Sequence, residues 1–171
     1  KTLTTVEASV SSLNLKGTRL FSGMYINELL TRLLHNHVEH KNLYNTYQET
    51  LLALRGDSAV EPALRGFELQ LLNELGYGIN LTTECHSDLP LSAEAHYHFI
   101  PDVGFERVVE LPSSGPQAQN LIPGAHIIAL KTLDFSDGDA ALSAKRLLRS
   151  ALARHLGDKP LASRALFKQI A

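Results

Sequence analysis

Apolar residues in the first part of the chain recur at helical spacing. The spacing predicts a helix from Ser22 to about Asn36, with Ser22 as its N-cap. Its apolar stripe follows positions i, i+3, i+4, i+7 and i+8: Ile26, Leu29, Leu30, Leu33 and Leu34. One face of this helix should therefore pack against a core.

Two further helices follow with the same period. The first is expected from about Asn42 to Arg55, where Gly56 stops it. Its apolar face comprises Leu43, Tyr47, Leu51 and Leu54. The next has Pro62 near its first turn and ends at Gly76-Tyr77-Gly78. Its stripe comprises Leu64, Phe67, Leu71, Leu72 and Leu75.

The period changes from about Ile79 and returns to helical later. Short runs at 81–85, 97–100 and 105–111, separated by proline and glycine, predict loops with two or three strands and a hairpin over 97–111. The stretch 113–116 (Ser-Ser-Gly-Pro) is a flexible connection. Helices are then expected over 126–133, 138–156 and 163–170, with Ser163 capping the last. The stripe of the long helix comprises Leu142, Lys145, Leu148, Leu152 and Leu156.

These elements predict a mainly α fold, a helical bundle of five or six helices with a small β-containing insertion at about 79–116. The chain begins with Lys1, and its opening run (Leu3, Thr5 and 6–10) alternates like a strand that has no nearby partner. A lone strand is not stable in water. We therefore expect the chain to be the C-terminal part of a longer protein.

Composition narrows the class of protein. With 171 residues, 18.8 kDa, 44% hydrophobic residues and a mean hydropathy of -0.06, the chain fits one globular core. The single cysteine excludes an internal disulfide. No apolar run is long enough to span a membrane, which favours a cytoplasmic location.

The sequence contains no signature of a nucleophilic enzyme or a phosphate-binding loop. Glu61 and Glu68 fall at helical spacing and are interpreted as a solvated face. His35, His37 and His40 are interpreted as a solvated helix end. An alternative function is a metal-binding enzyme or regulatory zinc module that uses Cys85, His86, His96 and His98, although adjacent residues rarely bind one metal together.

The charge is strongly asymmetric. Residues 1–138 hold nine Lys and Arg against sixteen Asp and Glu, a net charge of -7, whereas 139–171 hold seven against two, a net charge of +5. This end is either a solubilising helix surface or a patch for phosphate or acidic peptide. The candidate DNA-binding residues are Lys145, Arg146, Arg149, Arg154, Lys159 and Arg164.

Three separated motifs resemble the bacterial recombination mediator family RecO. They are the runs 25–30 (Tyr-Ile-Asn-Glu-Leu-Leu), 65–78 (Arg-Gly-Phe-Glu-Leu through Gly-Tyr-Gly) and 155–164 (His-Leu-Gly-Asp-Lys-Pro-Leu-Ala-Ser-Arg). The resemblance implies that 1–16 holds the last strand of an OB-fold and a linker, and that 17–171 is the helical domain. Many members hold zinc with four cysteines in the insertion. Here Cys85 matches the first position, but Val108 and Val109 replace the later pair, so neither zinc nor any other cofactor is expected. Packing of Tyr97, Phe99 and Phe105 would then hold this degenerate zinc-finger-like insertion together.

The resemblance also implies a non-catalytic function in DNA repair and recombination. Members anneal strands and, with RecR, load the recombinase RecA. Expected partners are therefore single- and double-stranded DNA, RecR and the acidic, Phe-terminated tail of single-stranded-DNA-binding protein. Such a tail needs an apolar slot and an Arg for its carboxylate. Arg65 matches the basic position, and Leu64, Leu72 and Leu75 are candidates for the slot wall.

Overall fold

The computed structural model describes residues 13–34, 38–110 and 120–167. The expected N-terminal strand, His35, His37 and the connection at 113–116 lie outside these ranges. The described part contains six helices: α1 (Gly17–Leu33), α2 (Lys41–Arg55), α3 (Val60–Glu74), α5 (Gly124–Thr132), α6 (Gly138–Leu156) and α7 (Ala162–Phe167). It also contains three strands: β1 (His96–Ile100), β2 (Gly104–Val108) and β3 (Leu121–Pro123). The predicted fold class, a helical bundle with a small β insertion, is confirmed.

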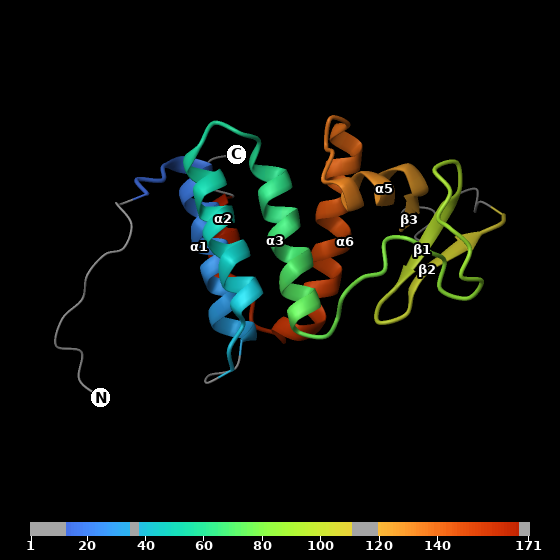
Figure 1. The fold of residues 1–171 in the computed structure, drawn as a ribbon, viewed down its shortest axis with the longest axis horizontal. Helices are drawn as coiled ribbons and strands as arrows, with labels where there is room; N and C mark the ends of the chain where they lie inside the picture. Colours follow the sequence, from blue (N-terminus) through green and yellow to red (C-terminus); the bar gives the residue numbers. More distant parts are fainter. Residues whose placement is uncertain (1–12, 35–37, 111–119, 168–171) are drawn as a thin grey trace.

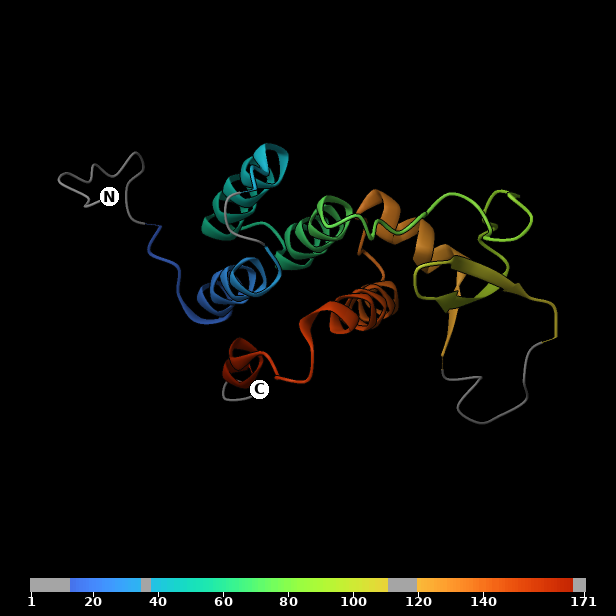
Figure 2. The same cartoon turned by 90° about the horizontal axis from the view of Figure 1, so that it is seen from below.

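The bundle and the sheet occupy opposite ends of the molecule. Helices α1, α2, α3 and α6 lie side by side, and α5 connects the bundle to the sheet (Figure 1). The bundle core is made of the buried faces of these helices, including Ile26, Leu29, Leu43, Leu54, Phe67, Leu71, Leu148 and Leu152. Helix α7 packs against α1 on the side of α6 away from the sheet (Figure 2).

Helix α1 begins earlier than the sequence pattern predicts. The predicted N-cap, Ser22, is a buried mid-helix residue, and its Oγ donates to the Thr18 carbonyl at 2.8 Å. The N-cap is Lys16, whose side chain makes no capping hydrogen bond. The assignment of Ser22 as a cap was therefore wrong, because a serine hydroxyl can bond either to the helix start or to the preceding turn.

Helices α2 and α3 match their predicted extents. Gly56 caps α2, and Leu75 and Gly76 end α3, where Gly76 has a φ of +84°, which favours glycine. The predicted stripe of α3 faces the core: Leu64, Phe67, Leu71 and Leu72 are buried, and Leu75 is half-buried against them.

Helix α6 has the bounds that the sequence predicts, and the Asp137 side chain caps it by accepting from the Asp139 N–H at 2.9 Å. The predicted stripe was wrong at its start, since Leu142 is 52% exposed. Lys145 is also exposed. The buried face uses small residues as well: Ala140, Ala144, Leu147, Leu148, Ala151, Leu152 and Leu156. Alanine allows the neighbouring helices to pack closely at these positions.

Ser163 lies inside α7 and is not its cap. The Glu28 carboxylate from α1 satisfies the start of α7. It accepts from the Ala162 N–H at 2.8 Å, the Ser163 N–H at 2.9 Å and the Ser163 hydroxyl at 2.6 Å. A cap from a helix distant in sequence thus replaces the predicted local one.

The strands form one antiparallel sheet in the order β2-β1-β3. The hairpin predicted over 97–111 is confirmed, with Phe99 opposite Phe105. Of the three runs considered as loops or strands, the one at 81–85 forms no strand, and among the described residues it makes only the isolated bridges of Thr83 and Glu84. Its place is taken by β3, which adds to the other edge of β1.

The predicted aromatic packing holds the insertion. Tyr97 and Phe105 are fully buried, and the ring of Phe105 lies 5.3 Å from that of Phe99. The buried Glu84 carboxylate accepts from Ser87 Oγ at 2.6 Å, Arg107 Nε at 2.6 Å and Tyr97 OH at 3.2 Å. The hydrogen bonds from Ser87 and Arg107 lower the pKa of Glu84. One ionised carboxylate thus links the loop to both strands of the hairpin.

Candidate functional site

A pocket of about 340 Å³ opens between four helices of the bundle. Figure 2 shows how these four helices, α1, α3, α6 and α7, are arranged when seen from below. Its lining residues are Thr18, Ser22 and Tyr25 of α1, Val60, Glu61, Leu64, Arg65 and Glu68 of α3, Lys145 and Arg149 of α6, and Arg164 and Phe167 of α7. We refer to this cavity as the Arg65 pocket.

Arg65 is buried, with only 4% of its surface exposed. Its Nη1 donates to Glu68 Oε2 at 2.5 Å and its Nε to Glu61 Oε2 at 3.2 Å. These carboxylates lie three residues after and four before Arg65, so one face of α3 presents all three groups. Among the described residues, the contacts with Glu68 and Glu61 are the two hydrogen bonds of the Arg65 guanidinium, and neither uses Nη2.

Glu68 is the most enclosed charged group of the pocket. Its other oxygen accepts from the Tyr25 hydroxyl at 2.5 Å, and 1% of the residue is exposed. Burial raises the pKa of Glu68, against the effect of Arg65 and Tyr25. Burial and the nearby Glu68 also raise the pKa of Tyr25, so its hydroxyl stays protonated and donates. The interpretation of Glu68 as part of a solvated face was wrong, whereas Glu61 does lie half-exposed at the rim.

Three further cations surround the opening. Lys145 and Arg149 are four residues apart on α6 and share a face, and Arg164 comes from α7. None of these three has an ion-pair partner within 4 Å in the described part of the chain. With Arg65 the lining holds four cations against the two carboxylates of Glu61 and Glu68. The site therefore favours an anionic ligand.

The pocket also has an apolar wall. Val60 and Leu64 line it from α3, and Phe167 lines it from α7, where its ring meets Phe21 edge-on at 5.9 Å. An apolar slot beside unpaired cations can take a ligand that carries both a hydrophobic group and negative charge.

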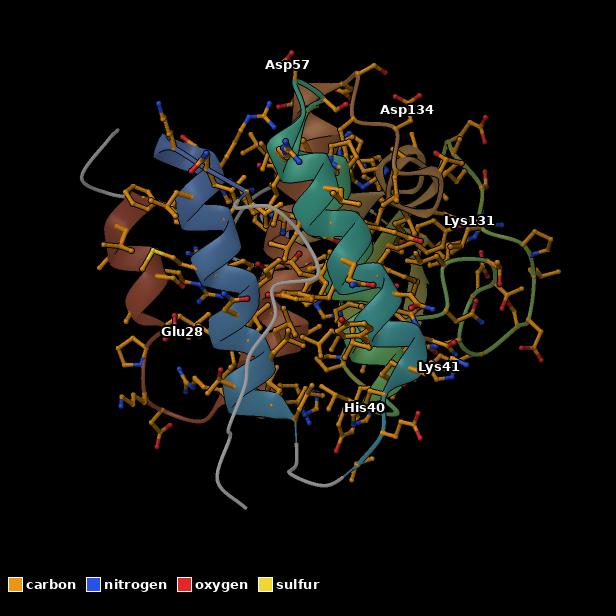
Figure 3. All side chains as sticks on the ribbon, turned by 60° about the vertical axis from the view of Figure 1, so that its left-hand side comes forward. Glu28, His40, Lys41, Asp57, Lys131 and Asp134 are labelled. Carbon is orange, nitrogen blue, oxygen red and sulfur yellow. The ribbon has the colours of Figure 1, made fainter. Side chains whose placement is uncertain are left out.

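Glu28 positions α7, one of the four helices that line the Arg65 pocket. Figure 3 labels it on the side of α1 that faces α7. Its three hydrogen bonds fix the start of α7, the helix that supplies Arg164 and Phe167. Partial burial acts to raise the pKa of Glu28, but the hydrogen bonds from Ser163 and Ala162 outweigh it and lower the pKa. The carboxylate is therefore ionised near neutral pH.

The structure brings together five of the residues that the sequence singled out: Leu64, Arg65, Lys145, Arg149 and Arg164. Leu72 is fully buried and lines a different cavity, beside Tyr77 and His155, whose rings stack at 3.8 Å. Leu75 is half-buried and does not line the Arg65 pocket.

The remaining predicted DNA-binding residues lie elsewhere. Arg146 faces a groove beside the sheet, Arg154 pairs with Asp102 at 3.0 Å, and Lys159 is exposed in the loop after α6. Sequence reasoning missed Tyr25, Val60 and Phe167 as pocket residues. Only the helical spacing of Glu61 and Glu68 around Arg65 could have indicated the buried ion pair.

The four residues of the alternative metal site do not come together as a set of ligands in the described part of the chain. Cys85 is partly buried, while His86 is exposed, with its Nε2 3.9 Å from Glu106 Oε1. Within 13–34, 38–110 and 120–167, no three His, Cys, Asp or Glu side chains converge as metal ligands would. Nor does any helix of these ranges have the length and apolar character needed to cross a membrane.

Comparison with known proteins identifies the family. The family model described as "Recombination protein O C terminal" matches residues 15–165. A protein of Stutzerimonas stutzeri (strain A1501) named "DNA repair protein RecO" is 42% identical over 99% of this chain and 69% of its own length. Relatives of the same name from Pseudomonas putida (strain W619) and Shigella flexneri are 45% and 40% identical, over 91% and 99% of this chain.

The chain spans about two thirds of the length of these relatives, between 65% and 69%. The family match covers all four helices that build the Arg65 pocket up to residue 165. The matched range contains the motifs at 25–30, 65–78 and 155–164. The chain belongs to the RecO family of DNA repair and recombination proteins, and it matches that family's C-terminal domain.

Proposed function

We propose that this chain is a non-catalytic interaction module of recombinational repair, whose Arg65 pocket binds the acidic, Phe-terminated tail of single-stranded-DNA-binding protein. The observation that carries the proposal is the meeting of an apolar slot with four cations from three helices. Docking of the tail recruits the protein to DNA that the partner covers.

The two parts of the pocket match the two parts of such a tail. The ring of a terminal Phe fits the slot between Val60, Leu64 and Phe167. The terminal carboxylate and the acidic side chains meet Lys145 and Arg149, which form no ion pair within 4 Å among the described residues. A charge-assisted bond is stronger than a neutral one, which offsets part of the desolvation of the tail.

Arg65 contributes to the binding of the tail from a buried position in the pocket. Its Nε and Nη1 already donate to Glu61 and Glu68, and the N–H groups of Nη2 would donate to the tail. The ion pair fixes the guanidinium in one orientation before the ligand arrives, which reduces the entropy lost on binding.

We also propose that the basic residues of α6 and the segment after it contact single- and double-stranded DNA: Lys145, Arg146, Arg149, Arg154, Lys159 and Arg164. In this proposal the protein aids strand annealing and, together with RecR, the loading of RecA. The net charge of +5 over 139–171 supports the DNA contact. The family name of the relatives supports the repair process.

The test is a titration of a fluorescent acidic peptide that ends in Phe. Arg149→Ala should weaken binding by roughly 1.5 to 3 kcal/mol, the range of a hydrogen bond to a charged group. Arg55→Ala, an exposed arginine at the end of α2, is the matched control and should bind as the unmodified chain does. Arg65→Ala should weaken binding too, but it also leaves Glu68 buried alone, so Arg149 is the cleaner position.

Two altered peptides separate the parts of the site. A C-terminal amide removes the carboxylate, and replacement of the Phe by Ala removes the ring. Each should lose most of the affinity. Equal binding of the amidated peptide, or an Arg149→Ala chain that binds like the Arg55→Ala control, would contradict the proposal.

A further inference from the structure

A second cavity, of about 290 Å³, lies between α6 and the sheet. Its lining residues are Ser143, Arg146, Leu147 and Ser150 of α6, His98 and Phe99 of β1, Pro101, Asn120, and Leu121 and Ile122 of β3. Figure 2 shows the sheet on the side of α6 opposite to α7. This α6–sheet groove is therefore separate from the Arg65 pocket.

The polar groups of the groove suit an anion. Arg146 supplies a guanidinium, Ser150 a hydroxyl, and Asn120 an amide, and the Arg146 side chain has no ion-pair partner in the described ranges. No acidic residue is among the described residues that line this groove. The Arg65 pocket, in contrast, contains Glu61 and Glu68. A phosphate would meet donors here without facing a carboxylate in the wall.

Different faces of helix α6 line the two cavities. Lys145 and Arg149 lie on the face toward the Arg65 pocket, and Ser143, Arg146 and Ser150, spaced by three and four residues, lie on the face toward the sheet. Ser143 Oγ lies 2.8 Å from His126 Nδ1, which fixes its position against α5. The basic residues of α6 therefore serve two different sites.

We propose that the α6–sheet groove binds the backbone of single-stranded DNA, with Arg146 on a phosphate and Phe99 and Ile122 against the sugar or base. This inference deepens the proposed DNA contact by assigning it a site. The apolar residues beside the cation match a nucleotide, which has an anionic phosphate and a flat apolar base.

Another cavity adjoins the α6–sheet groove farther along α6 and would extend the proposed DNA site. Phe99 and Pro101 line both this groove and the neighbouring cavity that contains Arg154. Arg154 lies eight residues after Arg146, which corresponds to roughly 12 Å along a helix. A strand that follows α6 thus meets a second cation, which in the unbound chain pairs with Asp102.

The experiment compares three variants of the whole chain in titrations of labelled oligo(dT) and of the acidic peptide. Arg146→Gln should weaken oligo(dT) binding roughly fivefold to tenfold at about 50 mM salt and reduce the magnitude of the salt slope by about 0.7, the effect of one lost phosphate contact. Ser150→Glu, which places a carboxylate in the groove, should weaken DNA binding at least as much. Neither variant should change peptide binding. Arg149→Gln, the matched change on the other face, should weaken peptide binding and should lower the affinity for oligo(dT) and its salt slope by less than Arg146→Gln does.

Each outcome decides between the proposals. Equal loss of DNA binding in Arg146→Gln and Arg149→Gln would overturn the separate groove, because DNA would then cover all of α6. A chain that binds the peptide but not oligo(dT) would overturn the groove and the DNA contact together, and would leave the tail proposal intact. Failure of peptide binding, with DNA binding that depends on Arg146, would reject the tail proposal and support the groove. Thermal unfolding of each variant verifies that the fold is retained.

Discussion

Arg65 and Glu68 form an ion pair that is almost sealed from solvent, with Nη1 and Oε2 2.5 Å apart. Removing two charges from water is costly, and the pair offsets this cost only while both members are present. The hydroxyl of Tyr25 completes the group by donating to the second oxygen of Glu68. The ion pair thus connects the stability of the bundle to the shape of the Arg65 pocket.

Loss of one partner should destabilise the fold more than loss of both. Arg65→Ala leaves a buried carboxylate and should lower the free energy of unfolding by roughly 3 to 5 kcal/mol. The double variant Arg65→Ala with Glu68→Leu removes the charge as well and should recover most of this loss. Urea unfolding of the two variants measures the difference. If the double variant is no more stable than the single one, Glu68 is not an uncompensated charge in Arg65→Ala.

Docking of α7 should depend on pH through Glu28. The folded chain lowers the pKa of Glu28 below its usual 4.5, so the folded state binds this proton more weakly than the unfolded state does. The stabilisation is present above pH 4.5 and is lost as the pH falls through the lowered value. The protection factors of the Ala162 and Ser163 amides, which compare exchange with the intrinsic rate at the same pH, should therefore fall in acid. In Glu28→Gln these amides should exchange faster at neutral pH and lack the acid step, and an identical acid step in that variant would exclude Glu28 as its cause.

Gly124 should be intolerant of any side chain. A Cβ at this position would lie 1.9 Å from the Ser92 carbonyl oxygen, which belongs to the backbone. Gly124→Ala should destabilise the fold by at least about 3 kcal/mol, because the insertion must shift away from α5. Gly138→Ala, where a Cβ meets nothing within 4 Å, is the matched control and should be neutral or stabilising by up to about 1 kcal/mol. Thermal unfolding of both variants checks the contrast.

Asp102 should weaken DNA binding because its ion pair with Arg154 competes with a phosphate for the guanidinium. Asp102→Asn removes the carboxylate 3.0 Å from the guanidinium and should tighten oligo(dT) binding by about twofold to fivefold, the scale of an exposed ion pair. Asn tolerates the left-handed backbone at this position, where φ is +64°. Asp88→Asn, also at positive φ and exposed, is the control. A gain of equal size in both variants would show only the effect of net charge.

The helices could be predicted largely from the sequence because each buries a periodic apolar face. The bounds of α6 follow from Asp137, Gly138 and Gly157, whose local chemistry starts and stops a helix. The start of α1 was missed because its first turn has no capping side chain. Strand β3 was missed since its three residues form a strand only by pairing with β1.

The candidate site was predictable only in part. The family motifs indicated Arg65, and the charge asymmetry indicated Lys145 and Arg149. Sequence could not show that these residues share a cavity, because α3 and α6 meet only through tertiary packing. For the same reason Leu72, on the same helix as Leu64, was grouped with the slot although it faces another cavity.

The hydrogen bonds of Glu28 to Ser163 join positions 135 residues apart. During synthesis, a chain from which α1 and α3 have emerged already has Arg65 and Leu64. It still lacks α7, the helix that carries Arg164 and Phe167. The Arg65 pocket is completed only when α7 emerges and docks on Glu28. If the pocket binds the proposed tail, unfinished chains would not compete for it with chains whose bundle is fully made.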